Sequence, residues 1–441
     1  MSMAAPLATH LGTPARLDRL GGGRWWRAAK HALDGASPLA VLSPASGRSM
    51  LNGRAVNDNA LISRQGGIKY VVGADGILSA IPANTLAYDW SSGVRELLLE
   101  GQATNSLRNS TMQGTVVGAP GTTPTYWSVA PSGNSGLTRQ IVGFGTALGM
   151  PYIDIRWYGT ATGTGGCTMY PEATTSVTAA SGDTWTMSAY LALVGGSLAG
   201  CSLIHGLTER SPAGSALNAN TLTVTPGASL TRYAATLAFV NASTAYVGPT
   251  INVIPTAVGS VIDITVRIAA PQLEKSPAAT SYIPTSGAAV TRPTDIAPLW
   301  ATAGTATTWA WRGDVQSREN WRDIIRATGG AYFQNAAGVP SAAFLGGRTD
   351  DSGPQSATPA IPGVVGICGG WGASGRIIAM NGDTPRTMAS QVDRARTSMA
   401  IGNTLGLSSG QVLRLRELVA WQLPDRPSAA GCQAQARLWS A

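Results

Sequence analysis

Charged side chains are scarce in this sequence, since Asp, Glu, Lys and Arg make up only 12% of its 441 residues. Lysine is nearly absent, because every basic residue except Lys30, Lys69 and Lys275 is an arginine. Low charge combined with 54 Gly and 26 Pro is typical of a turn-rich β protein. The formal net charge of +8 is scattered along the chain, so it indicates a mildly basic surface that would attract acidic polysaccharide or a neighbouring subunit, not nucleic acid.

Cysteine and histidine are too few, and too far apart, for a metal site. No C-x-x-C spacing occurs, and only three histidines are present, so we expect no metal and no cofactor. Four scattered cysteines do not form a secreted disulfide framework, and the first 19 residues lack the apolar core of a signal peptide. We therefore expect synthesis in a reducing bacterial cytoplasm. The cysteines are Cys167, Cys201, Cys368 and Cys432.

Long hydrophobic runs are also missing. No stretch of about 18 apolar residues could span a bilayer, and no heptad pattern predicts a coiled coil. The sequence therefore predicts a soluble protein without membrane insertion.

Short runs with period-two alternation, separated by Gly, Pro, Ser and Asn, predict the strands. We expect an all-β fold with two tandem β-sandwich (jelly-roll) domains, at 59–295 and 296–441, and an N-terminal attachment arm at 1–58. Candidate strands of the first domain are Val94–Glu100, Pro151–Tyr158, Thr184–Val194, Cys201–Thr208, Thr221–Val224, Thr231–Val240 and Val261–Ala270. Those of the second are Ala306–Arg312, Arg322–Ala327, Ala342–Leu345, Val364–Gly369, Gly375–Asn381, Thr397–Gly402 and Gln411–Trp421, with a short helix near Ser428–Leu438.

The border between the two domains is predicted where the last strand of the first domain ends. Four prolines follow that strand and remove backbone donors, so the chain is expected to leave the sheet over a surface. They are Pro271, Pro277, Pro284 and Pro293.

Two phrases resemble a known junction. The run from Ala269 to Asp295 contains PQLE and TSYIPTSGAAVTRP, and the run from Leu97 to Leu107 reads LLLEGQATNSL. With Ile62-Ser63-Arg64 and the run from Gly73 to Leu78 upstream, this order resembles bacteriophage and gene-transfer-agent spike and tail-fibre proteins. The resemblance implies a carbohydrate-binding-type jelly roll on the surface of a virion or phage-like particle.

The C-terminal region resembles concanavalin-A-like and laminin-G-like sandwiches. An apolar strand from Arg376 ends in the Asn-Gly turn at Asn381, and the run Leu413–Trp421 is similar to the last strand of that family.

The N-terminal arm contains two adjacent tryptophans, Trp25 and Trp26. Trp26, Ala29 and Leu33 share one face of a short helical pattern. We interpret Trp25 and Trp26 as attachment residues, which dock on the chain's own first domain or on another subunit or virion protein.

No catalytic residues are predicted. Residues 406–410 match G-x-S-x-G, but a strand follows the serine where that motif needs a helix. Asp350 and Asp351 are neighbours that would point apart, and the sequence does not bring Asp154 and Asp183 together as a glycosidase would need. We expect a protein that is not an enzyme.

One strand has the residues that sugar recognition requires. Period two places Ile153, Ile155 and Trp157 on one face, and aromatic, carboxylate and guanidinium groups on the other. Aromatic rings stack on the apolar face of a pyranose, and Arg makes paired hydrogen bonds. The alternative is a solvent-facing strand with an Asp–Arg pair and covered tyrosines. The polar face consists of Tyr152, Asp154, Arg156 and Tyr158.

Four further residues are candidate carbohydrate contacts. Tyr190 lies on the polar face of its own strand and could extend the first set. Trp371, Arg376 and Asp383 fall near predicted loop or hairpin ends of the second domain.

Together these features predict an adhesin on a virion surface that binds host capsular polysaccharide or lipopolysaccharide without covalent chemistry. Its other partners would be virion structural proteins. Weak single sites favour several linked copies, so we expect a homo-oligomer, a trimer in a fibre or a pentamer on a capsid vertex. The alternatives are a structural connector without a glycan ligand and a polysaccharide depolymerase.

Overall fold

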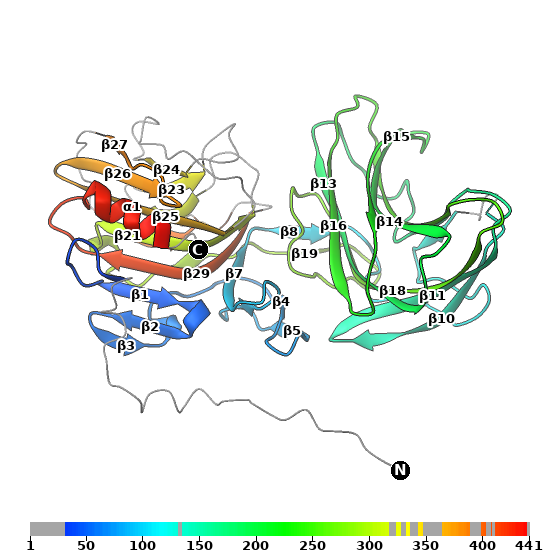
Figure 1. Cartoon of the computed structure of the whole chain (residues 1–441), viewed down its shortest axis with the longest axis horizontal. Helices are drawn as coiled ribbons and strands as arrows, with labels where there is room; N and C mark the ends of the chain where they lie inside the picture. Colours follow the sequence, from blue (N-terminus) through cyan, green and yellow to red (C-terminus); the bar gives the residue numbers. More distant parts are fainter. Residues whose placement is uncertain are drawn as a thin grey trace, which may run out of the picture.

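The protein is all-β, which confirms the predicted fold class. The computed structural model describes residues 31–130, 135–316, 323–327, 332–335, 343–346, 364–388, 398–402, 407 and 411–438. Over these residues it has one α-helix, α1 (Ala429–Leu438), and three 3-10 helices, η4 (Pro44–Ser46), η5 (Asp58–Ala60) and η6 (Ala303–Thr305). The strands gather in two bodies that meet at a narrow junction (Figure 1).

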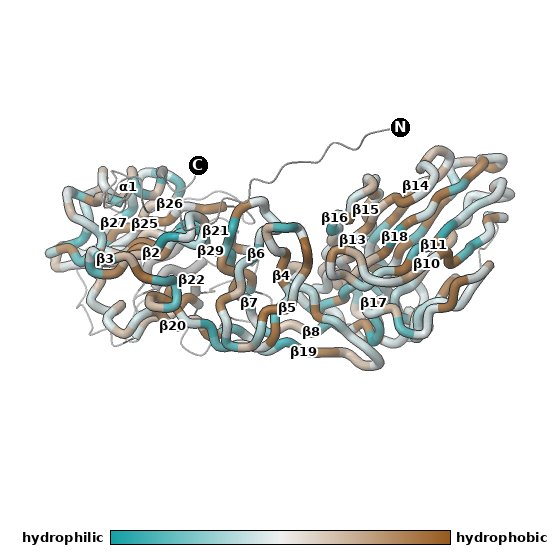
Figure 2. The backbone as a smooth tube through the Cα atoms, turned by 90° about the horizontal axis from the view of Figure 1, so that it is seen from below, coloured by the Kyte–Doolittle hydropathy of each residue, from teal (hydrophilic) through white to brown (hydrophobic). Residues whose placement is uncertain are grey.

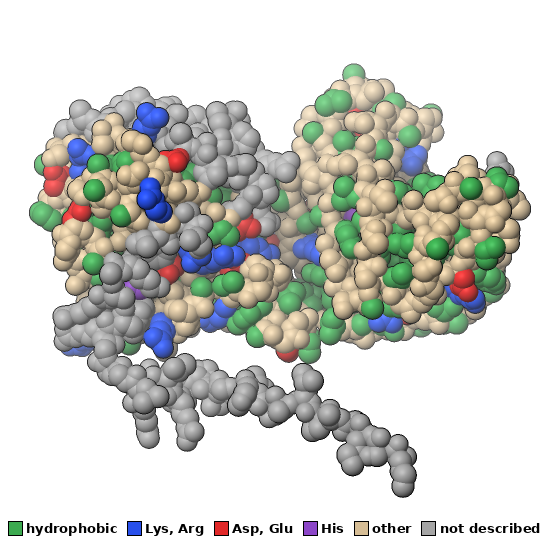
Figure 3. Space-filling model, viewed as in Figure 1, with side chains coloured by type: hydrophobic (Ala, Val, Ile, Leu, Met, Phe, Trp, Pro, Cys, Tyr) green, Lys and Arg blue, Asp and Glu red, His purple; other side chains and the backbone are tan. Residues whose placement is uncertain are grey.

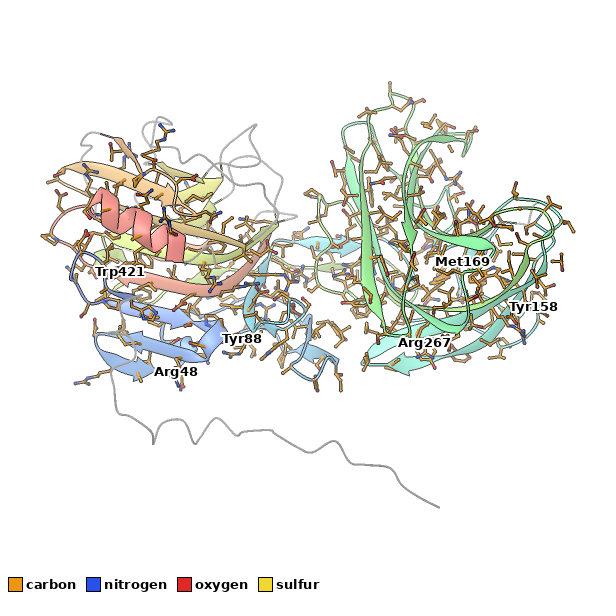
Figure 4. The ribbon with its side chains drawn as sticks, viewed as in Figure 1. Arg48, Tyr88, Tyr158, Met169, Arg267 and Trp421 are labelled. Atoms are coloured by element: carbon orange, nitrogen blue, oxygen red, sulfur yellow. The ribbon has the colours of Figure 1, made fainter. Side chains whose placement is uncertain are left out.

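The central body comprises residues 103–294 and is built around two five-stranded antiparallel sheets. The first sheet has the order β10 (Thr138–Ala147), β11 (Met150–Thr160), β18 (Val261–Glu274), β13 (Thr184–Gly196) and β16 (Thr231–Ala238). The second has the order β15 (Ala216–Val224), β14 (Cys201–Arg210), β17 (Tyr246–Pro255), β12 (Cys167–Tyr170) and β9 (Ser128–Val129). Their inner faces share one core, in which Trp157 and Ile264 pack with Leu203 and Ile251. Figure 4 shows Met169 between the two sheets.

The terminal body combines residues 31–102 with residues 295–438. Its larger sheet contains β27 (Arg386–Met388), β26 (Gly375–Met380), β25 (Val364–Gly372), β21 (Thr308–Gln316), β29 (Val412–Trp421), β1 (Ala40–Ser43), β2 (Arg48–Leu51), β3 (Arg54–Val56), β7 (Glu96–Glu100) and β6 (Tyr88–Asp89). Its smaller sheet contains β20 (Ala297–Pro298), β28 (Met399–Ile401), β22 (Asp323–Ala327), β23 (Tyr332–Asn335) and β24 (Ala343–Gly346). Trp309 and Trp311 pack with Ile325 in the core that the two sheets share. On the other face of the larger sheet, α1 buries Cys432 and Ala436.

The central body is an insertion within the terminal body, and this differs from the predicted division at 58/59 and 295/296. β29 pairs with β21 along one edge, and with both β1 and β7 along the other. The N-terminal strands therefore complete a sheet whose remaining strands come from the C-terminal part of the chain. Without them, one edge of β29 would expose unpaired backbone groups. Such long-range pairing leaves no trace in local periodicity.

The chain crosses between the bodies at two adjacent strands, β8 (Ala103–Asn105) and β19 (Val290–Arg292). The hairpin of β4 (Lys69–Val72) and β5 (Leu78–Ile81) lies between the bodies, as the two views in Figures 1 and 2 agree.

The proline-rich segment predicted as a surface exit is instead largely packed into this junction. Ile283 is 3% exposed and Thr285 1% exposed. β18 also continues through Pro271, because a β-bulge at Ala270 interrupts the regular pairing with β13 there. The border is therefore a tightly packed connection.

A buried cluster of ion pairs holds the junction together. Asp295 accepts a hydrogen bond from Arg64 Nε at 2.7 Å and another from the ammonium group of Lys69. Lys69 also lies 3.1 Å from Glu100, which forms a 2.8 Å ion pair with Arg292. These five side chains are at most 3% exposed.

Burial and charge oppose each other in this cluster. Burial alone would raise the pKa of Glu100, but Arg292 and Lys69 outweigh it and hold that pKa well below its usual range. Ser281 strengthens the effect, because its N–H and its hydroxyl both donate to Glu100 at 2.7 Å. All of these residues except Lys69 belong to the phrases quoted above, so those phrases mark the structural junction.

Candidate functional site

The predicted polar face of β11 exists and lies on the outside of the central body. Ile153 and Ile155 are fully buried and Trp157 is 2% exposed, so the predicted core face is confirmed. Tyr152, Asp154, Arg156 and Tyr158 occupy the opposite face. Figure 4 shows Tyr158 on this outer side, with Arg267 of the neighbouring strand β18 on the same side.

Each charged residue of this face pairs with β18 rather than with its neighbour on β11. Arg267 donates from Nε and Nη2 to both oxygens of Asp154, each at 2.8 Å. Arg156 makes the same two-pronged contact with Asp263, at 2.8 and 2.7 Å. Two bidentate guanidinium–carboxylate pairs therefore lie side by side across β11 and β18.

Each arginine also stacks on a tyrosine. The guanidinium carbon of Arg267 is 3.7 Å from the ring centre of Tyr152, and that of Arg156 is 4.4 Å from the ring centre of Tyr158. We call these six residues the stripe: Tyr152, Asp154, Arg156, Tyr158, Asp263 and Arg267. The stripe fixes two flat rings and two planar ion pairs in one surface.

Hydrogen bonding favours the charged forms of Asp263 and Arg267. The hydrogen bonds from Arg156 lower the pKa of Asp263, and those to Asp154 raise the pKa of Arg267. The side chains of Arg156 and Asp263 are 37% and 55% exposed, so their outward-facing edges can still bind a ligand.

Glycine in the edge strand β10 leaves one side of the stripe uncovered. Gly143 lies opposite Asp154, and Gly145 lies opposite Tyr152. A Cβ at Gly145 would come within 3.4 Å of the Tyr152 hydroxyl. The two glycines thus keep the carboxylate and the ring accessible from the edge of the sheet.

Tyr190 lies on the same face of the sheet as Tyr152. In the register of the sheet, Tyr152 on β11 and Tyr190 on β13 both lie opposite Ala269 of β18. The small Ala269 separates the two tyrosines, and all three belong to one hydrophobic cluster with Tyr282.

Beyond Tyr190 lies a cleft of about 700 Å³ between the two bodies. Sequence reasoning missed this cleft, because its walls come from segments far apart in the chain. It also missed the pairing of Arg267 and Asp263 with β11. The sequence did contain a signal for these two residues, because the period-two alternation of β18 places both of them on its polar face.

The three C-terminal candidates do not join the stripe. Trp371 and Arg376 lie opposite each other in the β25–β26 pair, and they are only 6% and 7% exposed. Asp383 is half-buried and follows the predicted Asn-Gly turn, in which Asn381 has φ 49° and Gly382 φ 82°. Burial of Trp371 within the terminal core prevents its ring from stacking on a sugar.

Some predictions fall outside the described residues. The attachment residues Trp25 and Trp26, the adjacent Asp350 and Asp351, and Ser408 of the G-x-S-x-G match lie there. Of the two acids considered as a catalytic pair, Asp154 is held by Arg267, and Asp183 forms a 2.7 Å ion pair with Lys275.

The described residues contain no disulfide, no cluster of metal-binding side chains and no membrane-spanning helix. All four cysteines are buried and unpaired by disulfides. In the part of the chain that the structure describes, no group of His, Cys, Asp and Glu is arranged to hold a metal ion, and no helix is long and apolar enough to cross a membrane.

Comparison with known proteins finds neither a matching family model nor a matching curated protein.

Proposed function

We propose that this protein binds host capsular polysaccharide or lipopolysaccharide through the stripe, as an adhesin on the surface of a virion or phage-like particle. The observation that carries the proposal is the paired arrangement itself: two partly exposed tyrosine–arginine stacks, each fixed by a bidentate carboxylate. The virion setting rests on the resemblance of the phrases around Glu100 and Ser281 to spike and tail-fibre proteins.

A fixed, flat and polar surface suits a sugar chain. A pyranose has an apolar face for a ring and hydroxyl groups that bind planar donors and acceptors. Because the ion pairs already hold Arg156 and Arg267 in place, little side-chain entropy is lost on binding. Such a site is shallow, so several linked copies would supply the affinity that one copy lacks.

Binding without bond cleavage is the mechanism that fits these carboxylates. A glycosidase needs one carboxyl group that keeps its proton. Arg156 instead lowers the pKa of Asp263, and Arg267 engages both oxygens of Asp154.

The test is binding to an array of bacterial capsular and lipopolysaccharide sugars. Tyr158→Ala and Arg156→Ala should each weaken binding by about 1–3 kcal/mol, through lost stacking or a lost charged hydrogen bond, with little change in melting temperature. Tyr126→Ala is the matched control, because Tyr126 is 38% exposed and stacks on Arg108 at 4.0 Å outside the stripe.

Three results would point elsewhere. If the stripe variants bind as the control does, the ligand site is not the stripe. If the wild-type protein binds no glycan but joins particles normally, it is a structural connector. If the protein releases reducing ends from purified capsule, it is a depolymerase.

A further inference from the structure

The cleft between the two bodies has aromatic walls that come from both of them. Tyr70 of β4 and Trp90 after β6 line one side, and Tyr190 of β13 and Arg232 of β16 line the other. The first three side chains are partly exposed, whereas Tyr282 is 3% exposed and meets Tyr70 edge-on, with ring centres 5.8 Å apart. A cleft of about 700 Å³ with these walls is of the size that takes a small ligand.

The charge in this cleft is unbalanced, and Arg232 is the reason. Its Nη2 donates to Ser188 Oγ at 2.9 Å and to the Thr280 carbonyl at 2.7 Å, and both acceptors are neutral. Its Nε is buried without a hydrogen-bond partner among the described residues. Within that part of the chain, no carboxylate lies in ion-pair distance of Arg232, unlike the two arginines of the stripe.

The other charged groups near the cleft do not supply that missing partner. Asp89 is 3% exposed and already accepts hydrogen bonds from Val72 N at 2.9 Å and from Arg414. Glu274 interacts electrostatically with Arg232, but it is fully buried and accepts hydrogen bonds from Thr280 instead, and burial raises its pKa despite Arg232. In Figure 3, basic side chains are visible on both sides of the gap between the bodies.

The cleft is continuous with the stripe through the row Tyr152, Ala269 and Tyr190. Adjacent strands are about 4.8 Å apart, so this row is only about 10 Å long. One polysaccharide chain lying on the stripe can therefore place a residue in the cleft.

We propose that the cleft binds an anionic sugar residue, whose carboxylate or phosphate pairs with the guanidinium of Arg232 while its ring packs between Tyr70 and Tyr190. This inference rests on the proposed function, because it assigns the class of polysaccharide that the stripe holds. Because Nη2 already makes two hydrogen bonds and Nε is buried, Nη1 is the donor that would pair with the anion, in a charge-assisted hydrogen bond.

The test compares an oligogalacturonate with the same oligosaccharide after reduction of its carboxyl groups to alcohols. The wild-type protein should bind the acidic form at least about tenfold more tightly. Arg232→Gln should remove that preference and leave binding of the neutral form unchanged, and Arg232→Lys should restore part of it. Thr231→Trp fills the cleft from an exposed position without altering Arg232, so it gives an independent readout should Arg232→Gln fail to fold.

The stripe variant separates the two proposals. Tyr158→Ala should weaken the acidic and neutral forms equally. If Arg232→Gln removes the preference for the acidic form while Tyr158→Ala leaves binding unchanged, the cleft binds the ligand and the stripe does not. If only Tyr158→Ala changes binding, the cleft proposal is overturned. It is also overturned if the wild-type protein does not prefer the acidic form. Competition by free galacturonate assigns a carboxylate and competition by glucose 6-phosphate a phosphate, whereas competition by neither contradicts an anion site.

Discussion

At the scale of single residues, His205 shows how burial decides the role of a titratable group. Its alternation within β14 places it on the same side as Leu203 and Leu207, and all three are fully buried. Nε2 donates to the Met187 carbonyl at 3.2 Å. His205 is therefore a core residue, as its position in the pattern predicts.

Because it is buried, His205 should make the central body sensitive to acid. Burial lowers its pKa from the ordinary value of 6.5 to about 4. The unfolded state then takes up a proton at higher pH than the folded state. The contribution of neutral His205 to the free energy of unfolding is therefore complete above pH 6.5. Between pH 6.5 and 4 this contribution is lost, by up to about 3 kcal/mol.

The measurement is the free energy of unfolding from denaturant titrations at pH 8, 6, 5 and 4. His205→Gln should show a smaller loss over the acidic range, because Gln does not titrate. Equal pH profiles for the two proteins would rule out His205 as the source of the acid sensitivity.

The same residue-level logic explains what could be predicted of the site. Period two correctly placed Tyr152, Asp154, Arg156 and Tyr158 on one face. The alternation of β18 likewise set Asp263 and Arg267 apart from its core residues. What the sequence lacks is the information that β11 and β18 are neighbours, because 100 residues or more separate the paired side chains.

At the scale of elements, most strands lie close to their predicted ranges, and the failures have a physical cause. The predicted range Thr184–Val194 became Thr184–Gly196, and Gln411–Trp421 became Val412–Trp421. Several central-body strands were missed, and β10 and β17 are the longest of them. β10 contains Gly143 and Gly145, and β17 contains Pro249, which lies outside the part of β17 that pairs with β12. Residues that normally end strands are tolerated at such edges.

The predicted N-terminal arm at residues 1–58 differs most from the observed structure. An attachment arm at residues 1–58 could be removed without unfolding the domains, yet β1 and most of β2 lie within residues 1–50. Val41 and Met50 are fully buried and Leu42 is 1% exposed. These side chains pack in the cores of the terminal body, so residues 31–58 are part of its larger sheet.

Two truncations should therefore behave differently. Deletion of residues 1–30 removes none of the described strands, and its melting temperature should stay near that of the full chain. Deletion of residues 1–50 removes several buried side chains, among them Val41, Leu42 and Met50 at about 1.5–3 kcal/mol each, and it uncovers the edge of β29. The longer deletion should lower the melting temperature markedly and promote aggregation in light scattering. Equal melting temperatures would contradict the role of β1 in the sheet.

At the scale of the whole molecule, the chain is organised around its junction. The terminal body is built from both ends of the chain, and the central body enters and leaves through β8 and β19. The phrases that resemble spike and fibre proteins supply β8, β19 and all of the ion cluster except Lys69. A motif read along the sequence thus located the connection between the bodies, while the packing around it could come only from the fold.

The junction cluster should couple the two bodies, and Asp295 is its most connected member. It accepts hydrogen bonds from Arg64, from Lys69 and from the backbone N–H of Glu100 at 2.8 Å.

In Asp295→Asn, two buried cations lose their shared carboxylate, at a cost of about 3–5 kcal/mol. Arg64 is 2% exposed and is followed by Gln65, so trypsin should spare the Arg64–Gln65 bond in the wild type and cleave it in the variant. Calorimetry should show one unfolding transition for the wild type and two for the variant. Asp263→Asn is the matched control, because it breaks a solvent-exposed ion pair, which contributes little to stability. If Asp295→Asn and Asp263→Asn show the same unfolding transitions and the same trypsin cleavage, the cluster does not hold the two bodies together.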